Sequence, residues 1–259
     1  MESQLNNFTP RKILVIQLRQ IGDVLLSTPA VRALRARYPE SDISFLVEPN
    51  GAGALKNNPD INTIIIREPD GGLINDLKLI KKIRSERFNL IIDFLANPRT
   101  SLISFLSGAK VTISYAKKPR SYLYTHRVIP KGEYSAENKL SLLRILGIKG
   151  CSVRPVFFVP PEARGAIGRF LEGEGVRTED FLVCINSAHR RITRKWKGYG
   201  ELADAISDLW GARVIFTWAK EEREEVEAIL RSSKRKHILA PQTEISELGA
   251  LIERADILI

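Results

Sequence analysis

Residues 12–23 read K-I-L-V-I-Q-L-R-Q-I-G-D, and this stretch decides the fold. Its first part, Lys12–Leu18, is an apolar run that predicts a buried strand. Gly22-Asp23 follows the strand and begins a helical stretch that ends near Tyr38. A buried strand followed at once by an amphipathic helix is the repeating unit of a parallel α/β sheet.

The same alternation continues along the chain. Pro29 lies inside the first helical stretch, so that helix is either kinked there or restarts with Thr28 as its cap and Pro29 in its first position. The basic segment 110–133 is expected to be rich in loop. Further strands are predicted at residues 42–47, 63–66, 89–94, 181–186, 213–217, 236–239 and 256–259, and further helices at 73–87, 135–146, 162–174, 199–210, 221–231 and 245–254.

A segment rich in glycine and proline, 147–161, separates the two series of strands and helices. We place the domain boundary within it, which gives domains 1–155 and 156–259, and predict an α/β fold of two doubly wound, Rossmann-like domains. Ligands of such domains bind at the carboxyl ends of the strands. The sequence stops inside the apolar run 257–259, where a core strand would lack its flanking turn, so we expect a truncated chain with an incomplete second domain.

The composition limits the class of protein. There are 40 Lys and Arg residues against 30 Asp and Glu, a net charge of +10, and 44% of the residues are hydrophobic. This apolar content excludes global disorder, and no apolar run approaches the roughly 18 residues of a membrane-spanning helix. The N-terminal residues lack the basic start and apolar stretch of a signal peptide, so a cytoplasmic protein is the default expectation.

The positive charge suits nucleic acid, anionic lipid, a phosphorylated substrate or a basic solvated surface. The basic residues form several clusters with few aromatic residues among them, and no RRM, KH or zinc-finger pattern occurs, so no nucleic-acid partner is expected. Cys151 and Cys184 form no C-x-x-C and the histidines are isolated, which argues against a zinc site or a catalytic thiol. No P-loop or G-x-G-x-x-G motif is present.

Three places carry residues suited to catalysis or binding. Asp23 follows the first strand, where it either caps helix N–H groups or acts as a general base, and Gly22 beside it allows a close backbone turn. Residues 187–197, S-A-H-R-R-I-T-R-K-W-K, precede a helix and form either an anion site or a solvated basic loop. Glu221-Glu222 follows strand 213–217, where an acidic residue either binds ribose hydroxyls or only charges the first turn of the next helix.

Together these segments resemble glycosyltransferase family 9, the lipopolysaccharide heptosyltransferases. The opening K-I-L-V-I-Q-L-R-Q-I-G-D-V-L-L-S-T-P-A-V-R-A-L is similar to the family's N-terminal signature, which is a strand, a basic residue and G-D-V-L-x-x-x-P. N-S-A-H-R-R-I-T-R-K-W-K resembles the family's basic loop P-G-x-R-x-x-x-K-x-W-P. N-P-D-I-N, L-L-R-I-L-G-I and P-Q-T-E-I-S-E-L-G-A-L-I-E-R-A-D resemble other landmarks, and L-R-Q-I-G-D-V-L-L-S-T-P looks most like the heptosyltransferase III type.

The resemblance implies a glycosyltransferase B-type fold, in which domain 1–155 binds the acceptor and domain 156–259 binds the nucleotide-sugar donor. The implied reaction transfers heptose from ADP-heptose to the inner core of lipopolysaccharide. It inverts the anomeric centre and uses no metal ion or cofactor. The implied location is the cytoplasmic side of the inner membrane of a Gram-negative bacterium, to whose surface the protein binds peripherally.

Carried over residue by residue, the resemblance makes Asp23 the catalytic base and Gly22 a backbone turn at the cleft between acceptor and donor. The family's loop lysine is Arg194 here, with Lys195 beside it, so that role is shared or exchanged. The family's D-[ST]-G-P-x-H motif would follow residue 259. The implied donor-binding residues are Arg190, Thr193, Arg194 and Lys195 at the diphosphate, and Glu221 or Glu222 at the ribose or adenine.

Two alternatives stay open on the sequence alone. One is a glycosyltransferase of the same fold that uses another nucleotide sugar or another acceptor. The other is a truncated, non-catalytic basic binding protein.

Overall fold

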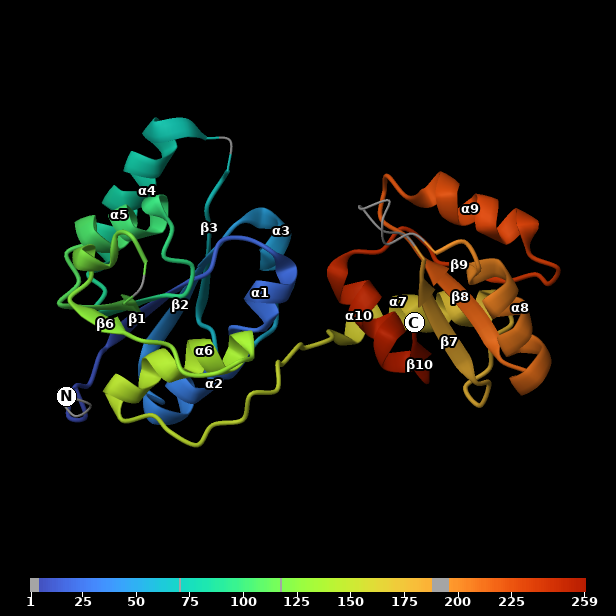
Figure 1. Ribbon diagram of the computed structural model, residues 1–259, viewed down its shortest axis with the longest axis horizontal. Coiled ribbons are helices and arrows are strands. Elements are labelled where there is room, and N and C mark those ends of the chain that lie inside the picture. Colours follow the sequence, from blue (N-terminus) through green and yellow to red (C-terminus); the bar gives the residue numbers. More distant parts are fainter. Residues whose placement is uncertain (1–4, 70, 117, 188–195) are drawn as a thin grey trace. The chain divides into compact units, whose positions relative to one another are not determined.

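The structure, a computed structural model, describes residues 5–69, 71–116, 118–187 and 196–259. The chain divides into two compact units, Met1–Phe158 and Val159–Ile259, and each is built on a parallel sheet (Figure 1). Helices cover both faces of each sheet. The predicted α/β fold of two doubly wound, Rossmann-like domains is confirmed.

The N-terminal unit contains a six-stranded sheet in the order β3-β2-β1-β4-β5-β6. The order reverses at β1, the central strand, and such a reversal opens a crevice at the carboxyl ends of the strands. The strands are β1 (Lys12–Ile16), β2 (Asp42–Val47), β3 (Thr63–Ile66), β4 (Leu90–Asp93), β5 (Val111–Tyr115) and β6 (His126–Val128). The helices are α1 (Ile21–Leu25), α2 (Thr28–Arg37), α3 (Pro49–Ala52), α4 (Gly72–Glu86), α5 (Pro98–Leu106) and α6 (Ser135–Leu142), with 3-10 turns η1 (Ser121–Leu123) and η2 (Leu143–Leu146).

Strand β1 is enclosed on both faces, which is why it reads as an unbroken apolar run. Ile13, Leu14, Val15 and Ile16 are all fully buried. On one face of the sheet, Leu14 and Ile16 belong to a cluster that also contains Ile80 and Ile83 of α4 and Ile103 of α5. Helices α4 and α5 therefore cover the same face.

The first helical stretch consists of two helices, so the helix restarts near Pro29 and is not merely kinked there. Helix α1 ends at Leu25, and α2 begins at Thr28 with Pro29 in its first turn and Ser27 in the N-cap position. Thr28 is not the cap, because its hydroxyl is used elsewhere. It donates to the carbonyl of Leu25 at 2.7 Å and accepts the N–H of Val156 at 2.8 Å.

The segment 110–133, expected to be rich in loop, also contains regular elements that were not predicted. Two strands and a 3-10 turn, β5, η1 and β6, lie in that segment. Strand β5 carries hydroxyl side chains that are buried because other segments satisfy them: Ser114 donates to the carbonyl of Asp93 at 2.8 Å, and Thr112 exchanges hydrogen bonds with Thr125. Helix α5 was also not predicted; it begins with a capping box between Asn97 and Thr100.

The C-terminal unit contains a four-stranded sheet in the order β10-β7-β8-β9. Helices α7 and α10 pack on one face of it, and α8 and α9 pack on the other. Cys184 lies fully buried in β7, and burial raises the pKa of its thiol to about 11, so it behaves as a core residue. The elements are α7 (Pro161–Gly173), β7 (Leu182–Asn186), α8 (Tyr199–Trp210), β8 (Arg213–Thr217), α9 (Arg223–Ser232), β9 (Ile238–Leu239), α10 (Ile245–Arg254) and β10 (Ile257–Leu258).

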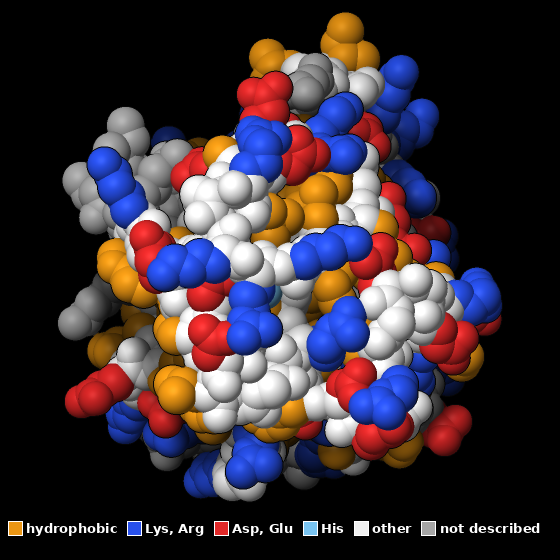
Figure 2. All heavy atoms as spheres, turned by 90° about the vertical axis from the view of Figure 1, so that its right-hand side faces the viewer, with side chains coloured by type: hydrophobic (Ala, Val, Ile, Leu, Met, Phe, Trp, Pro, Cys, Tyr) orange, Lys and Arg blue, Asp and Glu red, His pale blue; other side chains and the backbone are white. Residues whose placement is uncertain are grey.

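The surface of the C-terminal unit carries charges of both signs. On the face seen in Figure 2, Lys and Arg side chains lie among Asp and Glu side chains, and no large area is of one sign. On that face the net positive charge of the chain is therefore not gathered into one patch.

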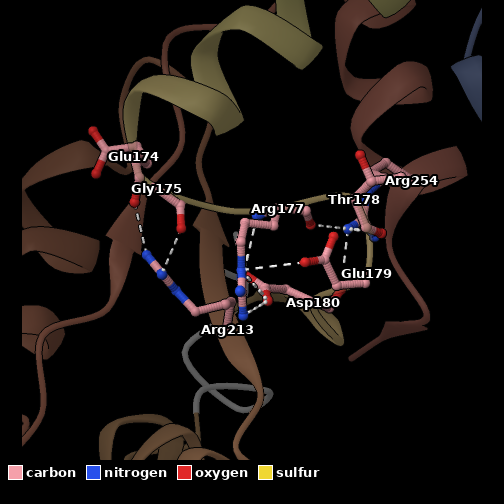
Figure 3. Close-up of polar contacts among 8 residues, drawn as sticks. All are labelled: Glu174, Gly175, Arg177, Thr178, Glu179, Asp180, Arg213 and Arg254. Carbon is pink, nitrogen blue, oxygen red and sulfur yellow. Dashed lines mark hydrogen bonds and ion pairs between the residues drawn. The ribbon is translucent and has the colours of Figure 1, made fainter.

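Arginines hold the loop between α7 and β7 in place (Figure 3). Arg213 donates to the carbonyls of Glu174 at 2.7 Å and Gly175 at 2.9 Å, so β8 is tied to the end of α7. One terminal nitrogen of Arg254 donates to three carbonyls of the loop, those of Arg177, Thr178 and Asp180. This loop precedes β7 and so lies at the amino ends of the strands, the edge that such sheets use for stability rather than for ligand binding.

Candidate active site

Asp23 lies just beyond the carboxyl end of the central strand. Its side chain is 47% exposed and belongs to the short helix α1. No side chain caps that helix, so the capping interpretation of Asp23 has no support in the structure. The left-handed residue of the turn is Gln20, with φ of 62°, whereas Gly22 lies inside α1. A Cβ at Gly22 would have no atom within 4 Å, so this turn does not require a glycine there.

Lys139 of α6 points at Asp23 from inside the unit. Its ammonium donates a 2.6 Å hydrogen bond to the main-chain carbonyl of Asp23 and lies 3.9 Å from the carboxylate oxygen Oδ1. The Lys139 side chain is only 4% exposed. Burial lowers its pKa to about 8, although the charge of Asp23 opposes that shift. At neutral pH the ammonium is therefore still mostly protonated and attracts the Asp23 carboxylate.

Asp23 and Lys139 line a cavity of about 450 Å³. Its walls come from the segments that follow β1, β4, β5 and β6 and from the start of α6, so it lies at the carboxyl edge of this sheet. They carry carboxylate, ammonium, amide and hydroxyl groups, which suit a ligand with many hydroxyl groups. The lining residues are Gln17, Asp23, Phe94, Leu95, Tyr115, Lys118, Pro130, Glu133, Ser135, Asn138 and Lys139.

A buried carboxylate supports one wall of the cavity. Asp93, at the end of β4, is fully buried, and its Oδ1 accepts the N–H groups of Leu95 and Ala96, both at 2.9 Å. Its Oδ2 accepts the hydroxyl of Tyr124 at 2.7 Å, and that hydroxyl also contacts Ser101. Burial raises the pKa of Asp93, while these hydrogen bonds act in the opposite direction. The network fixes the turn that carries Phe94 and Leu95 into the cavity.

Tyr115 presents its ring to the same cavity from the end of β5. Burial raises the pKa of Tyr115 far above its ordinary value, and the charges of Asp93 and Asp23 raise it further. Its hydroxyl therefore stays protonated and can donate a hydrogen bond to a ligand throughout the physiological pH range.

The C-terminal unit carries the other predicted site residues. Glu221 and Glu222 lie between β8 and α9, at the carboxyl edge of that sheet. Glu222 accepts the N–H of Ala219 at 2.9 Å and so closes its own turn, whereas Glu221 is exposed. The remaining predicted donor residues, Arg190, Thr193, Arg194 and Lys195, lie outside the described residues.

Lys139, Asp93 and Tyr115 were not among the predicted site residues. Lys139 carried a usable signal, because it lies on the buried stripe of α6 with Ala136 and Leu142. A charged residue on an apolar stripe indicates a buried partner. Among the residues that the structure describes, no group of three His, Cys, Asp or Glu side chains could hold a metal ion. Nor does any described helix have the length and apolar character to cross a membrane.

Comparison with known proteins gives consistent results. Residues 77–259 match the family model of glycosyltransferase family 9 (heptosyltransferase). The chain is 28% identical over 258 residues to lipopolysaccharide heptosyltransferase 3 of Escherichia coli (strain K12), covering 93% of this chain and 74% of that protein. It is 21% identical over 261 residues to the lipopolysaccharide core heptosyltransferase OpsX of Haemophilus influenzae, covering 96% of this chain and 73% of that protein.

Solved structures share the fold. A glycosyl transferase family 9 protein from Veillonella parvula superposes with a TM-score of 0.89 at 22% identity, covering 96% of this chain and 75% of that one. The E. coli ADP-heptose lipopolysaccharide heptosyltransferase II superposes with a TM-score of 0.75 at 18% identity, covering 95% and 78%. E. coli heptosyltransferase WaaC with ADP-2-deoxy-2-fluoro heptose gives 0.72 at 14% identity, covering 95% and 81%. The glycosyltransferase B-type fold implied by the sequence is thereby confirmed.

Proposed function

The chain belongs to glycosyltransferase family 9, the heptosyltransferase family, and from that premise we propose that it transfers heptose from ADP-heptose to the inner core of lipopolysaccharide. The E. coli relative is a lipopolysaccharide heptosyltransferase, and the H. influenzae relative is a lipopolysaccharide core heptosyltransferase. The observation that supports the proposal best is the half-exposed Asp23 carboxylate, which lies in a polar cavity beside the buried ammonium of Lys139.

In the proposed mechanism, Asp23 accepts the proton of an acceptor hydroxyl while that oxygen attacks the anomeric carbon of the donor. The bond from the anomeric carbon to the diphosphate breaks as the new glycosidic bond forms, so the configuration inverts. The proton ends on Asp23 and ADP leaves with the bonding electron pair. The carboxylate meets the first requirement of a general base, because it is accessible at the wall of the cavity.

Departure of ADP concentrates negative charge on the diphosphate. In the proposal Arg190, Thr193, Arg194 and Lys195 bind and stabilise that charge, and no metal ion is needed. The ribose or adenine is assigned to Glu221 rather than Glu222, since Glu222 is engaged in its own turn. The N-terminal unit binds the acceptor and the C-terminal unit binds the donor.

The proposed location is the cytoplasmic surface of the inner membrane of a Gram-negative bacterium. The net charge of +10 supports attraction to an anionic lipid surface.

Transfer assays with ADP-heptose, UDP-sugars and GDP-sugars, each in the presence of a chelator, test the proposal. ADP-heptose should be turned over at least about a hundredfold faster than the others, because the donor contacts are specific to its base and sugar. Preference for another nucleotide sugar would replace the donor assignment. Loss of turnover on chelation would contradict metal independence. Failure of the folded chain to bind ADP at millimolar concentration would favour the alternative of a non-catalytic basic binding protein.

A further inference from the structure

The outer surface of α4 and α5 exposes large apolar side chains. Leu73, Ile74 and Leu77 of α4 are 81%, 68% and 62% exposed, and Leu102 and Phe105 of α5 are 47% and 57% exposed. We call these five residues the apolar patch. Isolated exposed apolar residues are common, but several on adjoining helices form a surface that is costly to leave in water.

The two helices lie side by side and form one layer (Figure 1). Arg99 at the start of α5 pairs with Asp76 in the first part of α4 at 2.7 Å. Near their other ends, Arg84 of α4 donates to the carbonyl of Leu106 at 3.2 Å, so the helices run parallel. Because both pack their inner faces on the same side of the sheet, their outer faces point away from it together.

Apart from residues held in ion pairs, the charged side chains that α4 and α5 expose are basic. Lys78, Lys81 and Lys82 are exposed on α4 beside its apolar residues. The two acidic residues of α4 are neutralised: Asp76 is buried against Arg67 and Arg99, and Glu86 pairs with Lys12 at 2.8 Å. Helix α5 contains no acidic residue. One exposed acidic residue, Glu68, precedes α4, so among the described residues the lysines of α4 outnumber it three to one. An apolar surface with this excess of lysines is complementary to an anionic lipid bilayer, whereas a second copy of the chain would bring lysines against lysines.

The part of the apolar patch on α4 lies at the functional edge of the sheet. Helix α4 follows β3, so its first turns start at the carboxyl ends of the strands, where the cavity beside Asp23 opens. Its most exposed residues, Leu73, Ile74 and Leu77, are in those first turns.

We propose that the apolar patch and Lys78, Lys81 and Lys82 dock the N-terminal unit on an anionic bilayer, with the first turns of α4 in the lipid interface. This orientation brings the mouth of the cavity to the membrane surface, where a lipid-anchored sugar acceptor is displayed. The role in presenting an acceptor rests on the proposed transferase function, but the lipid contact itself does not.

Sedimentation with lipid vesicles tests the contact without any catalytic step. The chain should bind vesicles of equimolar phosphatidylcholine and phosphatidylglycerol and bind pure phosphatidylcholine much more weakly. Leu73→Ser/Ile74→Ser/Leu77→Ser should lower the affinity for the mixed vesicles by at least about tenfold, since buried apolar area is lost. Lys78→Gln/Lys81→Gln/Lys82→Gln should lower it by about fivefold for each lysine, and only on the anionic vesicles.

A matched control comes from the C-terminal unit, where Leu209 of α8 is 79% exposed, close to the 81% of Leu73. Leu73→Ser should weaken vesicle binding and Leu209→Ser should not. Equal binding by the wild type and the triple serine variant, or no binding by the wild type, would overturn the proposal. So would a dimer in analytical ultracentrifugation that the triple serine variant dissociates, because the apolar patch would then be a contact between copies.

Transfer assays separate this inference from the proposed function. The triple serine variant should keep wild-type turnover on a lipid-free core oligosaccharide and lose it only on acceptor embedded in vesicles. Vesicle binding without any heptosyl transfer by the wild type would leave the docking surface intact and refute the transferase proposal. Transfer to vesicle-embedded acceptor that the triple serine variant performs normally would refute the docking surface alone.

Discussion

Lys139 follows Asp23 by 116 positions in the sequence, yet its ammonium donates a 2.6 Å hydrogen bond to the Asp23 carbonyl. The same carbonyl accepts the hydroxyl of Ser27 at 2.8 Å. Two donors, one from α6 and one from the N-cap position of α2, therefore hold the main chain at Asp23, and the ammonium lies 3.9 Å from its carboxylate. Lys139 is a positioning residue in this arrangement, since it fixes the group proposed to act on the acceptor.

Asp23→Asn should abolish heptosyl transfer while the fold and the affinity for ADP stay unchanged. The amide keeps the size of the side chain but cannot accept the proton, and loss of a general base typically costs about 10²–10⁴ in rate. Steady-state turnover, calorimetric ADP binding and thermal unfolding measure the three quantities. Glu133→Gln, at another carboxylate of the same cavity, is the control and should change turnover far less. Near-normal turnover by Asp23→Asn would remove Asp23 from the role of base.

Lys139→Met should change how stability depends on pH. The pKa of Lys139 is about 8 in the folded chain, below its ordinary value of 10.5, because of burial. Between these values the unfolded chain binds more protons, so the unfolding free energy of the wild type should rise with pH relative to Lys139→Met, by up to about 3 kcal/mol. Denaturant titrations of both proteins from pH 7 to pH 11 measure the difference. If the unfolding free energies of the two proteins vary with pH in parallel, burial does not lower the pKa of Lys139.

The same variant should also alter the pH dependence of catalysis. In the wild type, the charge beside Asp23 is lost as the pH rises through about 8, the pKa of Lys139. The profile of kcat/KM against pH should therefore contain a step near that value, and the step should be absent from Lys139→Met. If Lys139 only stabilises the fold, Lys139→Met should lower the unfolding free energy but keep the step in the pH profile of kcat/KM.

Tyr124→Phe should lower the unfolding free energy by about 1–3 kcal/mol, because Oδ2 of the fully buried Asp93 would lose the hydroxyl hydrogen bond of Tyr124. Chemical denaturation measures the change. Tyr122→Phe is the control, since Tyr122 is 69% exposed and only two positions away. Equal effects of the two substitutions would mean that the hydrogen bond to Asp93 contributes nothing.

Arg67→Met should destabilise the N-terminal unit strongly. Arg67 is 2% exposed and pairs with both Asp76 at 2.9 Å and Glu48 at 3.1 Å, so its loss removes the one buried cation that these two carboxylates share and leaves them the partly exposed Arg99 and Arg19. Removal of one partner of a buried ion pair typically costs about 3–5 kcal/mol. Arg164→Met breaks a pair of similar length with Glu253 that is about half exposed, and it should have a much smaller effect. Similar losses from both variants would contradict the importance of burial.

Much of the architecture could be predicted from the sequence because the strands concerned are buried on both faces. Strand β7, predicted at 181–186, is observed at Leu182–Asn186, and β8 has its predicted bounds. Strand β5 was missed because its buried hydroxyl groups are satisfied by Asp93 and Thr125, which are distant in sequence and leave no local signal. The lack of a local sequence signal also explains why only part of the candidate site was predicted. Asp23 belongs to a motif with fixed spacing, whereas Lys139 is defined only by what it contacts.

The central position of β1 has a consequence for synthesis of the chain. Strand β1 pairs with β2 on one side and with β4 on the other, and β4 begins only at Leu90. Translation at about 5–20 residues per second leaves the second edge of β1 without a partner for a few seconds after β3 has been made. During that interval the nascent chain exposes an apolar strand edge able to pair with other chains. The strand that centres the finished sheet is therefore a segment of the newborn chain that needs protection from aggregation.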